Sequence, residues 1–272
     1  MHWTALFSHL FGIFASKEFP PFIRKIINNL YVKLMRVDMS EFNDPDSYPT
    51  LNALFSRELK YKRTIDTDDE ILISPVDALV TECGTIKDNI LLQIKGMPYS
   101  VDDLLTDRYV SCAQKIYGGS FINFYLSPKD YHRYHAPCKL RIVSLLYKPG
   151  KLYPVNISSC RKRLNLFIQN ERVIIECYDI AGRLFFIVLV GALDVGKIIL
   201  SFDSRVHKNV NCGKPSYYKY ENLWLDKAEQ IGMFMMGSTV VLIGQPDTFN
   251  IEVGQGEKIR FGEPVARLIR SF

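Results

Sequence analysis

The sequence predicts an α+β protein, in which amphipathic helices at the N-terminus precede a β-rich body. Apolar residues recur at helical spacing over the first 36 residues, whereas later apolar runs are only five to eight residues long and are separated by turn signals. Fifteen of the sixteen glycines lie at position 84 or later, where they can form those turns. A chain of 272 residues is also long enough to bury a core without disulfides.

Two helices are predicted in residues 1–36. The first is the apolar run from Trp3 to Phe14, which lacks the flanking features of a signal peptide and is too short to span a bilayer. The second follows Pro20-Pro21, because proline suits a first helical turn. Its apolar stripe comprises Phe22, Ile23, Ile26, Ile27, Leu30, Leu34 and Met35, and its other face comprises Arg24, Lys25, Asn28, Asn29, Lys33 and Arg36.

Positive charge is concentrated in this N-terminal part. Residues 1–36 hold five basic residues and one acidic residue, so four of the five net positive charges lie there. A basic face opposite an apolar stripe is what a helix on an anionic membrane needs. A helical hairpin that packs on the rest of the protein or on a second subunit is the alternative, and the two are compatible. A net charge of +5 is too small for a dedicated nucleic-acid binder.

The body, residues 37–272, is predicted to consist mainly of short strands. A short helix from Tyr48 to Leu59 and a charged surface connection from Lys60 to Glu70 come first. The predicted strands are Ile71–Ser74, Leu79–Thr85, Ile90–Lys95, Phe121–Leu126, Leu140–Lys148, Val173–Tyr178, Leu184–Val190, Lys197–Ser201, Ser238–Ile243, Phe249–Val253 and Val265–Ile269. No helix-length segments alternate with them, which favours a sandwich or partly closed barrel over a Rossmann sheet.

The last strands have a more specific geometry. Between Val240 and Leu268 they alternate with glycine turns at 244, 254, 256 and 262. This stretch resembles the half-barrel of biotinyl and lipoyl carrier domains. The resemblance concerns geometry only, because no lysine lies at a hairpin tip in the carrier context.

The six cysteines do not form a recognisable site. The nearest pair is 17 residues apart, so no C-x-x-C pair exists and neither a zinc ribbon nor a thioredoxin-like site is predicted. Reduced, mostly buried thiols are expected.

His132 and His135 lie three residues apart in the segment 126–138. Such a pair on a helical turn could converge on one metal ion, but no third ligand can be named, and no metal site is predicted. Their unperturbed pKa, about 6.5, makes either residue a candidate acid or base. Two surface histidines in a loop are the structural alternative.

A possible nucleophile lies at Gly237-Ser238-Thr239, just before an apolar strand. No glycine follows two residues after Ser238, so this is not the nucleophile elbow of hydrolases. Glycine before serine permits strained backbone that brings a carbonyl carbon close to the hydroxyl. With a base nearby, Ser238 could attack the Gly237 carbonyl and convert the peptide bond into an ester. Asp77, in the segment Ser74–Asp77, could orient a histidine that acts as this base, or could be an ordinary turn residue.

These segments together resemble the phosphatidylserine decarboxylases, a family of self-processing pyruvoyl enzymes of phospholipid synthesis. The resemblance runs from about Val37 to the end of the chain. Its matching segments are 37–41, 55–59, 74–77, 95–96 with 99–100, the histidine loop 126–138, 155–156, 170–173, 190–192, 195–196 and 236–239. The histidine loop and the Gly-Ser-Thr segment are the most specific.

The resemblance implies a role for each candidate residue. Ser238 would be the self-cleavage serine and Gly237 the end of the large chain, with residues 238–272 as the small chain. Asp77 and His135 would activate Ser238, and His132 would serve the decarboxylation. Elimination from the ester and hydrolysis would leave a pyruvoyl group, which would decarboxylate phosphatidylserine to phosphatidylethanolamine through a Schiff base. No external cofactor would be needed.

The family pattern is departed from at three places. Ala78 stands where glycine is usual, Met236 where leucine is commoner, and 227–230 reads Lys-Ala-Glu-Gln in place of Lys-Gly-x-Glu. All reacting groups are present. The implied enzyme is a peripheral protein on the cytoplasmic side of the cell membrane, a homodimer, with phosphatidylserine and an anionic lipid surface as partners. The alternatives are a pyruvoyl decarboxylase of a soluble amino acid and a processed but inactive membrane-surface protein.

Overall fold

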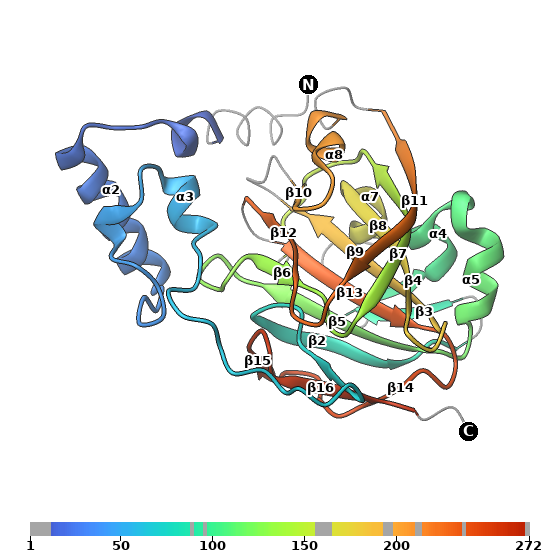
Figure 1. The fold of residues 1–272 in the computed structure, drawn as a ribbon. Coiled ribbons are helices and arrows are strands. Elements are labelled where there is room, and N and C mark those ends of the chain that lie inside the picture. The colour runs from blue at the N-terminus through green and yellow to red at the C-terminus, as the bar shows by residue number, and fades with distance from the viewer. Residues whose placement is uncertain are drawn as a thin grey trace.

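The computed structural model describes residues 12–87, 90–94, 97–155, 165–192, 198–209, 214–235 and 238–269. It confirms an α+β protein. Figure 1 shows α2 and α3 together at one side of the molecule, and α4 and α5 at the opposite side of the strands. The expected helix from Trp3 to Phe14 lies mostly outside the described residues, although residues 12–16 are helical.

The helical part at the N-terminus contains α2 (Pro21–Met35), η1 (Pro45–Ser47) and α3 (Leu51–Phe55). Helix α2 begins with proline and ends at Arg36, whose left-handed backbone stops the helix. The Thr50 side chain accepts a hydrogen bond from the Ala53 N–H at 3.1 Å and so caps α3, which is shorter than predicted. A small apolar cluster joins these helices, and its buried members are Ala15, Tyr31, Val37, Tyr48, Leu51, Leu54 and Phe55.

The exposed face of α2 is mainly apolar. Asn28 and Tyr31 are its buried residues. The apolar stripe points outward instead, with Phe22, Ile26, Leu30 and Leu34 each more than half exposed. The helix therefore docks on the protein through a mixed face, on which Ile27 and Val32 pack against the small apolar cluster, and leaves most of its apolar stripe exposed.

An eight-stranded antiparallel sheet forms the centre of the body. Its order is β11-β7-β8-β9-β13-β5-β2-β15, so it is open between β11 and β15. The strands span Ser216–Leu225 (β11), Leu140–Lys148 (β7), Arg172–Asp179 (β8), Leu184–Gly191 (β9), Ser238–Gly244 (β13), Ser120–Leu126 (β5), Ala78–Thr85 (β2) and Lys258–Ile259 (β15). The more detailed expectation of a sandwich or partly closed barrel, with a biotinyl-like C-terminal part, stays a prediction.

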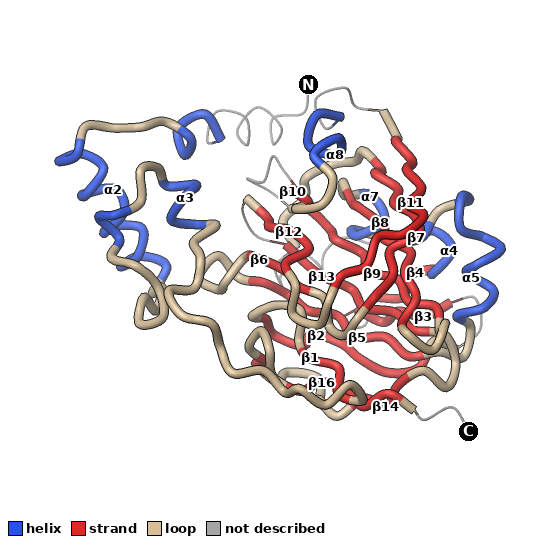
Figure 2. The backbone as a smooth tube through the Cα atoms, viewed as in Figure 1, coloured by secondary structure: helices blue, strands red, loops and turns tan. Residues whose placement is uncertain are grey.

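Three smaller sheets complete the strands. Their orders are β1-β16-β14, β10-β12-β6 and β3-β4. The strands span Ile71–Ile73 (β1), Pro264–Leu268 (β16), Phe249–Ile251 (β14), Ile198–Leu200 (β10), Gln230–Phe234 (β12), Arg133–His135 (β6), Ile90–Ile94 (β3) and Met97–Ser100 (β4). In Figure 2 the connection between α3 and β1 is the long tan stretch that joins the helical part to these strands.

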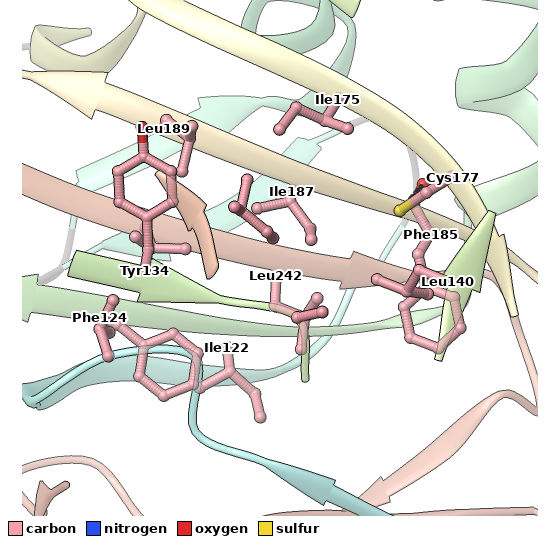
Figure 3. Packing of buried hydrophobic residues seen from close by; sticks show 14 of the residues in the cluster. Ile122, Phe124, Tyr134, Leu140, Ile175, Cys177, Phe185, Ile187, Leu189 and Leu242 are labelled. Carbon is pink, nitrogen blue, oxygen red and sulfur yellow. Dashed lines mark hydrogen bonds between the residues drawn. The ribbon is translucent and has the colours of Figure 1, made fainter. Parts of the chain in front are cut away.

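The large sheet buries both of its faces. Along β13, Val240 and Leu242 face the first apolar cluster, which includes residues of the three-stranded sheets, whereas Val241 and Ile243 face the second. Figure 3 shows part of the first cluster, with Ile122 of β5 and Leu242 of β13 close together.

The second cluster is covered by short helices that the sequence did not predict. They are α4 (Val101–Leu105), η2 (Asp107–Tyr109), α5 (Val110–Ile116) and α7 (Leu166–Gln169); a further helix, α8, spans Ser204–Asn209. Among the described residues, Cys83, Cys112, Cys138 and Cys177 are free thiols, as expected. Within the described part of the chain, no helix is long and apolar enough to cross a bilayer.

Candidate active site

Ser238 is the first residue of β13 and is completely buried. It pairs with Leu126 of β5 on one side and with Gly191 of β9 on the other. Its Oγ has no hydrogen-bond partner among the described residues. A buried hydroxyl without a partner costs about 1–3 kcal/mol, so it marks a position that stability alone does not explain. Gly237, the other half of the predicted cleavage site, lies outside the described residues.

Asp77 lies in the turn between β1 and β2, where it forms an ion pair with Arg63. Arg63 donates from Nη1 to Oδ1 at 2.5 Å and from Nη2 to Oδ2 at 2.9 Å. The Phe261 backbone N–H also donates to Oδ1, at 2.7 Å. Arg63 donates further to both carboxylate oxygens of Glu41, at 3.1 and 2.8 Å. The Asp77 carboxylate thus accepts three hydrogen bonds, two from Arg63 and one from Phe261, and one acceptor position on Oδ2 remains.

His135, at the end of β6, is buried and both of its ring nitrogens are engaged. Nδ1 lies 2.9 Å from the Ala228 carbonyl oxygen and must donate to it, which leaves Nε2 as the acceptor of the Tyr131 hydroxyl at 3.1 Å. The ring stacks on Phe261 with centroids 3.7 Å apart. Burial lowers the pKa of His135 to about 4. The imidazole is therefore neutral at pH 7, with its basic lone pair on Nε2.

His132 precedes β6 and is completely buried. Its Nε2 donates to the Ser127 carbonyl oxygen at 2.9 Å, and its ring stacks on Phe55 of α3 with centroids 4.0 Å apart. Burial, together with the nearby Arg57 guanidinium, lowers the pKa of His132 to about 3. Its Nδ1 has no hydrogen-bond partner among the described residues, so this neutral ring holds an unused basic lone pair inside the protein.

The four predicted residues lie in two pairs, Asp77 with His135 and Ser238 with His132, and the members of each pair are linked through other residues. The ring of Phe261 packs on His135 and its N–H binds Asp77, and the His135 N–H donates to the Pro75 carbonyl at 2.9 Å. Ser238 and His132 are related through the end of β5, because Leu126 pairs with Ser238 and the next residue, Ser127, binds His132. Within the described residues no hydrogen bond joins Asp77 to His135, or Ser238 to either histidine.

Sequence reasoning missed the residues that hold this site. Arg63 was expected on a charged surface connection, and that expectation is wrong for this residue, because its side chain is only 10% exposed and binds Asp77 and Glu41. Two aromatic residues also contact His135. Tyr131 lies in the histidine loop but was assigned no role, and Phe261 gave no sequence signal beyond its apolar character. Arg63 could have been suspected only from its nearness to a family segment, since charge spacing alone does not separate a buried arginine from an exposed one.

A cavity of about 570 Å³ opens beside these residues, between the helical part and the body. Arg36, Glu41 and Arg57 line it from the helical part. Asp77, Ser127 and Tyr131 are among the lining residues from the body. The cavity therefore touches the residues that hold both histidines. Among the described residues, no group of three or more histidine, cysteine or carboxylate side chains is arranged to hold a metal ion.

Comparison with known proteins gives one consistent result. A family model described as phosphatidylserine decarboxylase matches residues 51–267. The chain is 44% identical to a phosphatidylserine decarboxylase proenzyme from Campylobacter jejuni, over 95% of this chain and 97% of the relative. It is 43% identical to a proenzyme of the same description from Helicobacter pylori J99, over 95% of each chain. A more distant proenzyme, from Escherichia coli O9:H4, is 35% identical over 97% of this chain and 84% of the relative.

Proposed function

The chain belongs to the phosphatidylserine decarboxylase family, and on that premise we propose that it decarboxylates phosphatidylserine with a pyruvoyl group made from its own Ser238. The single observation that carries the proposal beyond the family is the completely buried Ser238 hydroxyl, which has no partner among the described residues. A hydroxyl with no structural hydrogen bond is free to react. Its setting among apolar residues also suits a small ketone in its place.

In the processing step, the Ser238 hydroxyl attacks the Gly237 carbonyl carbon and gives up its proton to a base. The peptide C–N bond breaks as the base passes the proton to the Ser238 nitrogen, and an ester replaces it. Elimination then releases the Gly237 carboxylate and gives dehydroalanine, whose hydrolysis releases ammonia and leaves the pyruvoyl group at the start of residues 238–272. His135 is the proposed base, supported by a pKa low enough to keep the ring neutral. Tyr131 must first release Nε2. Asp77 would stabilise the charged ring through its negative charge, which raises the pKa of His135.

In the decarboxylation step, a pyruvoyl group supplies a ketone that condenses with the substrate amine and accepts the electrons released as carbon dioxide leaves. His132 is the proposed proton carrier. The Ser127 carbonyl accepts from Nε2–H, so Nδ1 is the atom that would take a proton from the substrate ammonium and return it to the substrate carbon that loses carbon dioxide. The neutral ring is suited to take a proton first, and an anionic substrate nearby would raise its pKa and favour the charged form.

The substrate is proposed to arrive from a membrane that α2 contacts. The exposed apolar stripe of α2 supports this, because Phe22 and Leu34 are 75% and 67% exposed and have no protein partner among the described residues. Lys33 and Arg36, near the end of the helix, would favour an anionic surface. We place the protein as a peripheral homodimer on the cytoplasmic side of the cell membrane.

Intact mass and carbon dioxide release test the proposal together. The purified protein should separate into a chain ending at Gly237 and a chain of residues 238–272 whose mass reflects a pyruvoyl group. Vesicles of phosphatidylserine should release carbon dioxide, whereas free serine should release little. An uncut chain with an unmodified serine would contradict the processing step, and equal release from free serine would favour a decarboxylase of a soluble amino acid.

A further inference from the structure

Arg57 is a buried cation with which no carboxylate forms an ion pair among the described residues. Its side chain is 2% exposed and follows α3. Nη2 donates to the backbone carbonyls of Lys129 and Asp130, at 2.7 and 3.1 Å, and the guanidinium lies over the Phe42 ring at 4.4 Å. Its Nε has no hydrogen-bond partner among the described residues. A buried charge without a counter-ion is costly, so a site of this kind is suited to an anion that enters from outside the protein.

Four acidic residues line the cavity, and none of them forms an ion pair with Arg57 among the described residues: Asp38, Glu41, Asp77 and Asp130. Asp38 is exposed and accepts the Ser40 N–H at 2.9 Å, and its pKa is lowered chiefly by this hydrogen bond and less by Arg260 and Arg57. Glu41 and Asp77 both bind Arg63. The carboxylate of Asp130 accepts the Ser127 N–H at 2.7 Å, and burial raises the pKa of Asp130, which disfavours its charge. These acids are therefore poorly placed to act as the counter-ion of Arg57.

Further cations line the same cavity. Arg36, Lys129 and Lys258 all contribute to its wall, and none of them forms an ion pair with another described residue. Arg36 is the residue at which α2 ends, directly after Leu34 and Met35 of the exposed stripe. A lipid whose acyl chains follow this stripe would thus bring its phosphate to the mouth of the cavity.

Ser127 connects the cavity to the proposed reacting residues Ser238 and His132. Ser127 lines the cavity, binds His132 through its carbonyl oxygen, and follows the residue that pairs with Ser238. The cavity thus runs from the end of the apolar stripe to the neighbourhood of both groups.

We propose that Arg57, assisted by Arg36, binds the phosphodiester of the lipid headgroup in this cavity. This assignment rests on the proposed function and names the part of the substrate that the cavity recognises. The substrate carboxylate is a poorer occupant, because it leaves as carbon dioxide and an arginine that stabilised it would oppose the reaction. The phosphodiester keeps its charge throughout, and the planar guanidinium suits two of its oxygens.

Binding to the processed protein tests this without using activity. Glycerophosphoethanolamine carries the phosphodiester without a carboxylate, serine carries the carboxylate without phosphate, and inorganic phosphate represents the free ion. Titration calorimetry should show that Arg57→Met weakens glycerophosphoethanolamine binding at least about 10-fold and Arg36→Gln about 3-fold, with serine binding unchanged. Lys219→Gln removes an exposed cation on the edge strand β11 and should change nothing.

Arg57→Lys supplements Arg57→Met, because Arg57 also donates to two loop carbonyls and loss of these hydrogen bonds destabilises the fold. Arg57→Lys keeps the charge, loses the planar fork, and should weaken binding to an intermediate degree. The proposal is overturned by unchanged binding in both Arg57→Lys and Arg36→Gln. An equal loss of serine binding, or tighter binding of inorganic phosphate than of the diester, would also overturn it.

The two proposals fail differently. If glycerophosphoethanolamine binds in a manner that depends on Arg57 but phosphatidylserine vesicles release no carbon dioxide, the decarboxylase proposal fails and the anion site stands. If vesicles release carbon dioxide and the Arg57 and Arg36 variants bind normally, the anion site alone fails.

Discussion

Membrane contact by α2 can be tested by placing one charge on its exposed stripe. Leu34 is 67% exposed and is not one of the buried residues of α2. Complete burial of a leucine side chain stabilises by about 1.5–3 kcal/mol, so burial of two-thirds of it in lipid contributes about 1–2 kcal/mol. An added negative charge near an anionic surface costs about 1 kcal/mol more. Leu34→Asp should therefore weaken binding by about 2–3 kcal/mol, a fall of about 30- to 150-fold.

The assay is co-sedimentation with vesicles of phosphatidylcholine and phosphatidylglycerol, which present an anionic surface without the substrate. Ile180, in the turn between β8 and β9, provides the matched control because it is 61% exposed and lies outside the stripe. Ile180→Asp makes the same chemical change and should bind vesicles almost as the unmodified protein does. Equal losses in the two variants, or no loss in either, would refute the reasoning from the exposed stripe. Thermal unfolding should be nearly unchanged in both, since surface substitutions usually alter stability by about 0.5 kcal/mol or less.

Three further predictions concern the buried groups. Ser238→Ala should leave an uncut chain in denaturing electrophoresis without lowering the unfolding temperature, because its Oγ has no partner among the described residues; cleavage of this variant would exclude Ser238 as the nucleophile. His132→Phe keeps the ring on Phe55 but removes both nitrogens, so cleavage should persist while carbon dioxide release falls at least about 100-fold; full activity would exclude the proposed role. Burial raises the pKa of Glu171 to about 7 in the folded protein, from an ordinary value of 4.5, so the folded state holds a proton that the unfolded state releases between these values. Glu171 therefore destabilises the folded state as the pH rises through this window. In Glu171→Gln this loss is absent, so the slope of the free energy of unfolding against pH should be more positive than in the unmodified protein, by about 1 kcal/mol per pH unit. Urea unfolding between these pH values measures the slope, and equal slopes would contradict the assignment. The buried histidines act in the opposite direction, since their depressed pKa values favour the folded state above about pH 6.5 and destabilise it as the pH falls.

Several strands that the sequence predicted correctly have continuous apolar runs. Strand β13 is buried on both faces, and its run from Val240 to Ile243 shows this directly. Strand β11 was missed because it is an edge strand with partly exposed, alternating tyrosines and charged residues, which carry no clear apolar period. Helix α5 was missed because seven residues cover only two turns, too few to establish a helical period.

The site was predictable only where its residues lie in recognisable local segments. Ser238, Asp77, His132 and His135 lie in short segments with a family pattern. The surrounding contacts depend on long-range folding, as in the bond between Phe261 N–H and Asp77, whose residues are 184 positions apart. Local spacing holds no information on such a pair. Likewise, the docked side of α2 includes Asn28, which the sequence placed on the polar face and the structure buries.

The position of β13 has a consequence for what self-cleavage would produce. All seven residues of this strand pair with β5 on one side and with β9 on the other, and β15 and β16 pair with β2 and β1. A cut before Ser238 would therefore break one covalent bond, but the strands of the small fragment would remain paired with strands of the large fragment in two sheets. The pair would behave as a single folding unit, held together independently of dilution, and separation of the fragments would require the unfolding of the central sheet.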